Sequence, residues 1–138
     1  MLFLQKKLRN MESKYLTIQT RVVFPCTFND NYSLFGGMAM KWMDEVAYMT
    51  ATRYTRNRMV TISVEKVEFL IPVKEHSIVE IRGIIEKKTN SKVIIKVEIN
   101  CEEMYSSQQC LAVRALFEFA SVDENNQPIP IKEHSEKL

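Results

Sequence analysis

Residues 38–54 read MAMKWMDEVAYMTATRY, and two glycines, Gly36 and Gly37, stand immediately before them. The run contains neither glycine nor proline, so nothing in it interrupts a helix of about five turns. Its apolar residues cover more than the roughly 100° stripe of an ordinary surface helix. The stretch therefore predicts one long helix that is buried on most of its sides and ends at the polar residues 53–58.

Apolar and polar residues alternate in the segments around this helix, as they do in half-buried strands. Residues 17–24 (TIQTRVVF) predict an edge strand that Pro25 ends. Four more strands are expected after the helix, at residues 60–71, 78–85, 93–101 and 110–119. The first of these changes parity near Glu65 and Lys66, which predicts a β-bulge. The links between them are short enough for hairpin-type connections, at residues 72–77, 87–90 and 102–107.

The order of these elements predicts an α+β fold, a single curled antiparallel sheet of about five strands wrapped around one long central helix. A helix this apolar must cover its surface, and the sheet is its only available partner. We expect an N-terminal arm over residues 1–16, one domain over residues 17–121 and a polar C-terminal tail over residues 122–138.

Composition excludes several classes of protein. The 138 residues are 46% apolar, which suits one globular domain. The formal charge of +2 is too weak to indicate non-specific nucleic-acid binding. No stretch approaches the roughly 20 apolar residues that span a bilayer, and the N-terminus does not follow the pattern of a signal peptide. We therefore expect neither a nucleic-acid partner nor membrane insertion.

The three cysteines (Cys26, Cys101 and Cys110) are an odd number and form no CxxC pair. They predict a protein of the reducing cytoplasm without a disulfide framework. The two histidines, His76 and His134, lie near neither a cysteine nor each other, so we expect no metal site.

Residues 25–45 (PCTFNDNYSLFGGMAMKWMDE) resemble the helix-opening motif of the acyl-CoA thioesterases of the hot-dog superfamily. That motif has an Asn in the preceding loop, here Asn29, an FGG or HGG at the helix start, here residues 35–37, and an acidic pair inside the helix, here Asp44 and Glu45. Residues 60–73 (VTISVEKVEFLIPV) and 89–93 (TNSKV) resemble two later strand motifs of the family, so the resemblance covers roughly residues 18–120.

The resemblance implies a hot-dog fold and hydrolysis of an acyl-CoA thioester to a free acid and CoA. It implies no cofactor, because coenzyme A is part of the substrate. An exposed sheet edge is a liability unless it is covered. Hot-dog domains cover it by pairing edge to edge, so we expect a homodimer or a trimer of dimers. The alternative from another class is a non-catalytic hot-dog module that binds acyl-CoA or a related ligand.

Gly37 is the expected oxyanion donor. A glycine at a helix start leaves its backbone N–H unpaired and lets a ligand approach closely, because it has no Cβ. One such donor contributes about 3–4 kcal/mol to transition-state stabilisation in acyl transfer. The alternative is that Gly36 and Gly37 only allow close packing of the helix against the sheet.

Asp44 lies about two turns beyond Gly37 and so shares its side of the helix. An acid within an apolar stretch is costly unless it is exposed, paired or functional. Asp44 is therefore the expected general base or carboxylate nucleophile, and the sequence leaves both roles open. The alternative is a solvated acid at the helix edge. Glu45 points about 100° away and is expected to be a surface or interface charge.

The resemblance implies that Asn29 contacts the thioester or the water, in one arrangement from across a dimer interface. The alternative is an Asn that stabilises its own turn. The expected substrate-binding residues are Gly36, Phe35, Thr61, Ser91, Arg58 and Lys92. The last two represent a group of basic residues that could pair with the phosphates of CoA. The chain departs from the family pattern at Tyr32, where a glycine is usual, and at His76 and Ser77, where Gly-Asp is usual.

Overall fold

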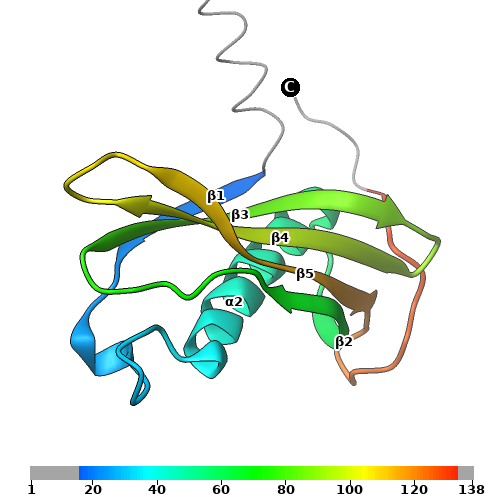
Figure 1. Cartoon of the computed structure of the whole chain (residues 1–138). Helices are drawn as coiled ribbons and strands as arrows, with labels where there is room; N and C mark the ends of the chain where they lie inside the picture. Colours follow the sequence, from blue (N-terminus) through cyan, green and yellow to red (C-terminus); the bar gives the residue numbers. More distant parts are fainter. Residues whose placement is uncertain (1–15, 134–138) are drawn as a thin grey trace, which may run out of the picture.

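The computed structural model describes residues 16–133, in which five strands form one antiparallel sheet and a long helix lies against one face of it (Figure 1). The strands are β1 (Thr17–Val22), β2 (Met59–Phe69), β3 (Ser77–Lys88), β4 (Lys92–Glu103) and β5 (Gln109–Ser121). The helix is α2 (Gly36–Thr55), and a short 3-10 helix, η1 (Pro25–Thr27), follows β1. The sheet order is β1-β3-β4-β5-β2. The predicted α+β architecture is therefore present.

One predicted connection is wrong. Residues 70–76 do not form a hairpin, because β2 pairs with β5 and β3 lies between β1 and β4. The link has to pass the ends of two intervening strands, a span of three strand spacings, about 14 Å. Seven residues can extend over about 23 Å, so a link of hairpin length is also long enough to cross. On its way the link accepts a hydrogen bond from Leu34 N at Val73 O (2.8 Å), beside the loop that precedes the helix.

The helix packs against the sheet along one side only. Its buried residues are Ala39, Trp42, Met43, Val46, Ala47, Thr50, Ala51 and Thr55. They meet the inward-facing residues of the central strands, among them Ile95, Phe117 and Phe119. A Cβ at Gly83 of β3 would collide with Thr50, so this glycine sets how closely helix and sheet approach. Lys41, Glu45 and Tyr48 are exposed on the opposite side, so burial on most sides is wrong for the single chain.

The two edges of the sheet are β1, as predicted, and β2. β2 has an irregular register between Glu65 and Glu68, and Lys66 adopts a left-handed conformation (φ 52°) there. This confirms the bulge expected from the change of parity. β2 carries three exposed apolar side chains, Ile62, Val67 and Phe69. Its outer edge is thus open and partly apolar in the single chain.

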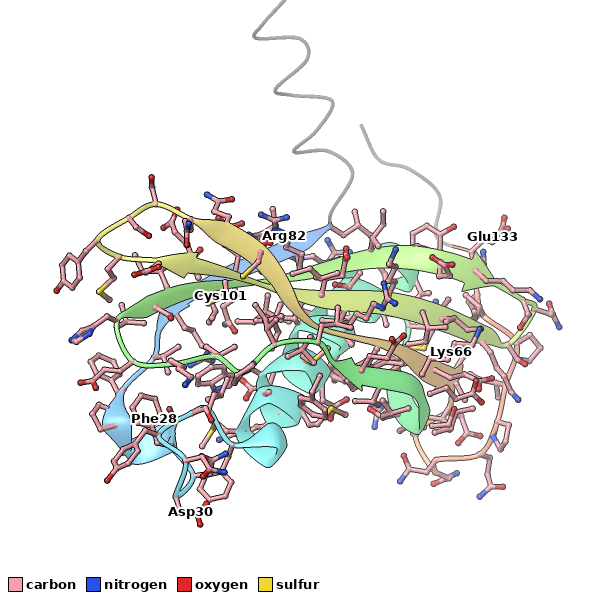
Figure 2. All side chains as sticks on the ribbon, in the orientation of Figure 1. Phe28, Asp30, Lys66, Arg82, Cys101 and Glu133 are labelled. Atoms are coloured by element: carbon pink, nitrogen blue, oxygen red, sulfur yellow. The ribbon has the colours of Figure 1, made fainter. Side chains whose placement is uncertain are left out.

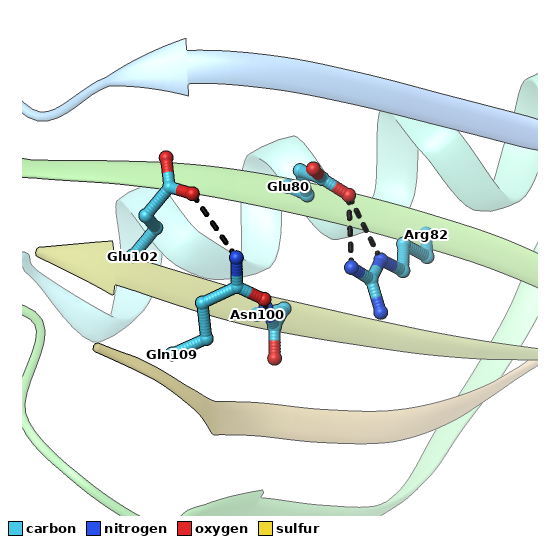
Figure 3. A network of polar contacts seen from close by, with 5 residues as sticks. All are labelled: Glu80, Arg82, Asn100, Glu102 and Gln109. Atoms are coloured by element: carbon cyan, nitrogen blue, oxygen red, sulfur yellow. Dashed lines mark hydrogen bonds and ion pairs between the residues drawn. The ribbon is translucent and has the colours of Figure 1, made fainter. Parts of the chain in front are cut away.

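The other face of the sheet carries paired polar side chains (Figure 3). Arg82 binds Glu80 (2.9 Å), and Gln109 donates to Glu102 (3.1 Å). Arg114 of β5 holds both carboxylate oxygens of Glu68 on β2 at 3.1 Å, which lowers the pKa of that carboxyl. Several charges of this face are therefore paired within the sheet.

Residues 122–133 continue along the end of the helix. The side chain of Asn57 donates to Lys132 O (2.9 Å) and accepts from Lys132 N (3.0 Å). Ile131 N donates to Asn90 O (2.8 Å), and Ile131 packs against the core. The first part of the expected tail is therefore held against the sheet and helix. The expected arm lies outside the described residues except for Leu16, as do tail residues 134–138.

Candidate active site

Asp44 projects from α2 toward the edge strand β2. The hydroxyl of Thr61 on β2 donates a hydrogen bond to Asp44 Oδ1 at 2.9 Å, and Asp44 is half-buried. Glu45 instead faces β1, where it lies 3.8 Å from Arg21. The guanidinium of Arg21 in turn lies over the ring of Trp42. The two adjacent acids are thus directed to opposite edges of the sheet, and only Asp44 has a polar partner from β2.

The start of the helix leaves backbone donors unpaired. Its first hydrogen bond runs from Ala39 N to Phe35 O (3.0 Å), and no side chain caps it. The N–H groups of Gly36, Gly37 and Met38 therefore have no acceptor inside the helix. Their partial positive charge, added to the helix dipole, favours an anion or a developing oxyanion at this end.

The two glycines differ in what their surroundings require. A Cβ on Gly36 would lie 3.3 Å from the ring of Phe69, so packing explains this glycine. A Cβ on Gly37 would meet nothing within 4 Å, and neither glycine has a positive φ. Packing and backbone conformation within this chain therefore give no reason for a glycine at position 37. Something outside the chain that approaches the backbone closely would give one.

Asn29 lies in the loop before the helix, which has Asp30 at its tip (Figure 2). Its side-chain Oδ1 accepts hydrogen bonds from Asn31 N (2.9 Å), Ser33 N (3.2 Å) and Ser33 Oγ (3.4 Å). The turn-stabilising role considered for Asn29 is therefore present. Because backbone donors fix the oxygen, the amide nitrogen points away from the turn, and it has no acceptor among residues 16–133.

A cavity of about 350 Å³ lies between this loop, the helix start and the link after β2. Its lining residues are Asn29, Ser33, Leu34, Gly36, Ala39, Phe69, Ile71, Pro72, Val73 and Val113. Asp44 lines a different, more open hollow with Glu45, Tyr48 and Met49. Gly37 and Asp44 are seven residues apart, about 10.5 Å along the helix axis. Within one chain, then, Asn29 and the helix start lie together and Asp44 lies apart.

The structure places the other expected site residues as follows. Thr61 contacts Asp44, and Phe35 is exposed beside the helix start. Ser91 lies at the β3–β4 hairpin, where its carbonyl accepts from Ser121 N (2.9 Å), and the neighbouring Lys92 pairs with Glu118 (3.6 Å).

Arg58 lines a separate cavity of about 440 Å³ beyond the other end of the helix, with Arg56, Lys132 and two acids, Asp123 and Glu124. Neither Arg58 nor Lys92 lines a cavity with a catalytic candidate among the described residues. Phe69, which covers Gly36 and lines its cavity, was missed as a site residue. The only signal for it was its place at the end of a strand motif.

Both departures from the family pattern fall on left-handed backbone. Tyr32 has φ 58° and His76 has φ 62°, a conformation that glycine adopts without steric cost. The turns are therefore kept although the glycine is replaced. Tyr32 is 76% exposed, and the rings of His76 and Tyr105 form a tilted pair with centroids 5.6 Å apart.

Residues 16–133 contain no group of three or more His, Cys, Asp or Glu side chains that could hold a metal ion. Over the same residues, no helix is both long and apolar enough to cross a membrane.

Comparison with known proteins identifies related chains. The model of the thioesterase superfamily matches residues 32–107. An uncharacterized acyl-CoA thioester hydrolase of Bacillus subtilis is 30% identical over 120 residues, 87% of this chain and 69% of that protein. The crystal structure of an acyl-CoA hydrolase from Bacillus cereus has a TM-score of 0.80 at 29% identity, over 84% of this chain and 71% of that one. A hexameric thioesterase from Yersinia pestis has a TM-score of 0.77 at 27% identity, over 83% and 93%.

The curled five-stranded sheet around one helix is shared with these structures, which confirms the predicted hot-dog fold. The matched segment begins in the loop after Asn29 and includes the helix with Gly37 and Asp44. The chain belongs to the thioesterase superfamily.

Proposed function

We propose that this chain hydrolyses acyl-CoA thioesters at a site where Asp44, the Gly37 N–H and the Asn29 amide act together, with two copies of the chain contributing to each site. The general reaction follows from the family and its named relatives: the chain is a thioester hydrolase of the acyl-CoA class. The residue roles and the shared site are our proposal.

The observation that carries the residue roles is the open space at Gly37. Gly36 is a glycine because Phe69 packs on it, whereas Gly37 has room for a side chain and an unpaired N–H. A thioester oxygen placed there accepts a hydrogen bond from the N–H that strengthens as the oxygen becomes negative. A Cβ at this position would obstruct that approach, which gives the missing reason for the glycine.

Asp44 supplies the base or the nucleophile. Thr61 holds its Oδ1, and Oδ2 has no hydrogen-bond partner among residues 16–133. Oδ2 either removes a proton from a water that attacks the thioester carbon or attacks that carbon itself. In both routes the C–S bond breaks, CoA leaves as a thiol after protonation of its sulfur, and water supplies the second oxygen of the acid. The free Asn29 amide nitrogen is suited to donate to the carbonyl oxygen or to orient the water.

Two arguments support a site shared between copies. The first is that Asn29 and Asp44 line separate hollows of one chain, toward opposite ends of the open edge strand: Phe69 at the end of β2 lines the first hollow, and Thr61 near its start binds Asp44. The second is that β2 is an unpaired edge with exposed apolar residues, which an antiparallel copy of β2 would cover. A dimer of this kind, or a hexamer built from three of them, places one copy's Asp44 near the other copy's helix start. The reaction as proposed needs no metal or cofactor.

CoA also carries phosphates, and basic side chains would hold them. Arg56 and Arg58 line one cavity beyond the helix, and Lys92 lies at the hairpin near that end of the sheet. These residues are the proposed phosphate contacts. Charge-assisted hydrogen bonds of this kind contribute to substrate binding, so their loss should raise KM more than it lowers kcat.

The test is CoA release from a panel of acyl-CoAs by the native chain and by Asp44→Asn. Glu45→Gln is the matched control, because it removes a neighbouring acid on the same helix that faces β1. Cys26 and Cys110 are exposed free thiols that would add to a thiol-reagent signal, so the loss of thioester absorbance should be followed in parallel.

We expect Asp44→Asn to lose turnover while keeping its fold, and Glu45→Gln to retain turnover. Full activity in Asp44→Asn would refute the role of this acid. Tight calorimetric binding of acyl-CoA by the native chain without any CoA release would identify a binding module instead.

A further inference from the structure

The cavity beside the helix start is mostly apolar and has one polar side. Asn29 and Ser33 lie on that side, and aliphatic and aromatic side chains form the rest. Gly36 is part of the lining, so the cavity begins one residue from the Gly37 N–H. A thioester whose oxygen sits on that N–H has its acyl chain directed at the apolar part. The pantetheine arm, which carries two amides, would leave those groups unpaired there.

The apolar part of the cavity is closed at its inner end. The residues there are Leu34, Ala39, Val73 and Val113, which are 8%, 2%, 3% and 2% exposed. All four belong to the main core cluster. An acyl chain longer than the cavity would have to displace these core side chains, which are close-packed and resist such changes. The volume of about 350 Å³ is near the lower limit of ligand cavities, which run from roughly 300 to 1,000 Å³.

In the single chain, Phe69 is the one residue lining this cavity whose large side chain is exposed, at the β2 edge where the second copy is proposed to lie. It is the last residue of β2, is 54% exposed and lies over Gly36. Ile71 and Pro72 follow it in the link, where Ile71 N donates to Ala112 O (3.3 Å) and Val73 O accepts from Leu34 N (2.8 Å). The ring is therefore the part of the lining that a single substitution can remove without opening the core.

We infer that this cavity takes the acyl chain of a short- to medium-chain thioester and that the Phe69 ring limits the length it accepts. This inference rests on the proposed function. It adds a substrate class and a specificity-determining residue to a site otherwise defined only by its reaction.

The experiment measures kcat/KM for straight-chain acyl-CoAs from acetyl-CoA to palmitoyl-CoA. Phe69→Ala widens the cavity from the side of the β2 edge, and Ala39→Val fills it from the core side. Phe24→Ala is the matched control, because Phe24 is a similarly exposed ring (59%) that does not line the cavity. Light scattering and inhibition by free CoA are recorded for every variant.

We expect Phe69→Ala to raise the ratio of kcat/KM for a longer chain over a shorter one by about 10-fold, the effect of one methylene in an apolar pocket. Ala39→Val should shift the preference to shorter chains, and Phe24→Ala should leave it unchanged. Inhibition by CoA, which has no acyl chain, should not change.

The inference is wrong, while the thioesterase function stands, if both cavity variants keep the native dependence of kcat/KM on chain length. It is equally wrong if they lower kcat/KM for every substrate by the same factor. If the native chain releases CoA from no substrate in the panel, both fail together. If Phe69→Ala disrupts the assembly, Ala39→Val tests whether this cavity holds the acyl chain, because residue 39 lies inside the core of a single chain. An unchanged chain-length preference in Ala39→Val would then refute the inference.

Discussion

Replacing Gly37 by alanine separates catalysis from folding, because the two should respond in opposite directions. A Cβ at this position meets nothing within 4 Å in the folded chain. The substitution should therefore cost no packing energy and should raise helix stability by up to about 1 kcal/mol, the difference in helix propensity between glycine and alanine. The same Cβ lies where the thioester oxygen would approach the N–H. Loss of one oxyanion donor lowers kcat by about 10² to 10³-fold, or roughly 3–4 kcal/mol.

The assay compares kcat and thermal unfolding for Gly37→Ala with those for Gly36→Ala. The Gly36 variant brings a Cβ to 3.3 Å from the Phe69 ring, which is half-exposed and can move. Its main effect should be on the shape of the acyl cavity, with kcat for the shortest substrates largely kept. The reasoning is refuted if Gly37→Ala is as active as the native chain, or if its loss of activity is matched by a loss of stability.

Three further predictions concern stability and reactivity. Gly83→Ala should lower the free energy of unfolding by about 1–3 kcal/mol, because its Cβ would overlap the helix; an unchanged urea midpoint would contradict this. Tyr32→Gly should raise stability by up to about 1 kcal/mol, as relief of a left-handed backbone worth about 1–2 kcal/mol exceeds the 0.5–1 kcal/mol entropy cost of glycine. Burial raises the pKa of the Cys101 thiol, so it should react with a thiol reagent only as pH rises well above neutral, whereas exposed Cys26 and Cys110 react first. Equal rates for all three at neutral pH would contradict that.

The fold was largely predictable from the sequence because the spacing of apolar residues and the local composition determine its elements. The helix, the edge position of residues 17–24 and the bulge near Lys66 all follow from patterns over a few residues. The path from β2 to β3 does not, because a link of seven residues fits both a hairpin and a crossing. The difference depends on β2 pairing with β5, a contact between residues about 50 positions apart.

The candidate site was predictable in its residue types and less so in its geometry. The motif indicates Asn29, Gly37 and Asp44, but it does not say that they line different hollows of one chain. Nor could the sequence separate Gly36 from Gly37, because the distinction depends on the ring of Phe69, 33 residues away. The sequence allowed two competing roles for Asn29, a contact with the thioester or water and stabilisation of its own turn. The structure gives its oxygen to the turn and leaves its nitrogen free, so the roles are compatible.

Hydrolysis at a site shared between two copies is tested most directly by mixing two inactive variants. Asn29→Asp keeps the oxygen that holds the loop and removes the amide donor, and Asp44→Asn removes the acid. In a mixed dimer one site has both native residues and the other has neither. After the two variants are unfolded together and refolded, the account predicts recovery of about a quarter of native activity, because half of the dimers are mixed and each has one intact site. A mixture that stays as inactive as its two components would contradict it.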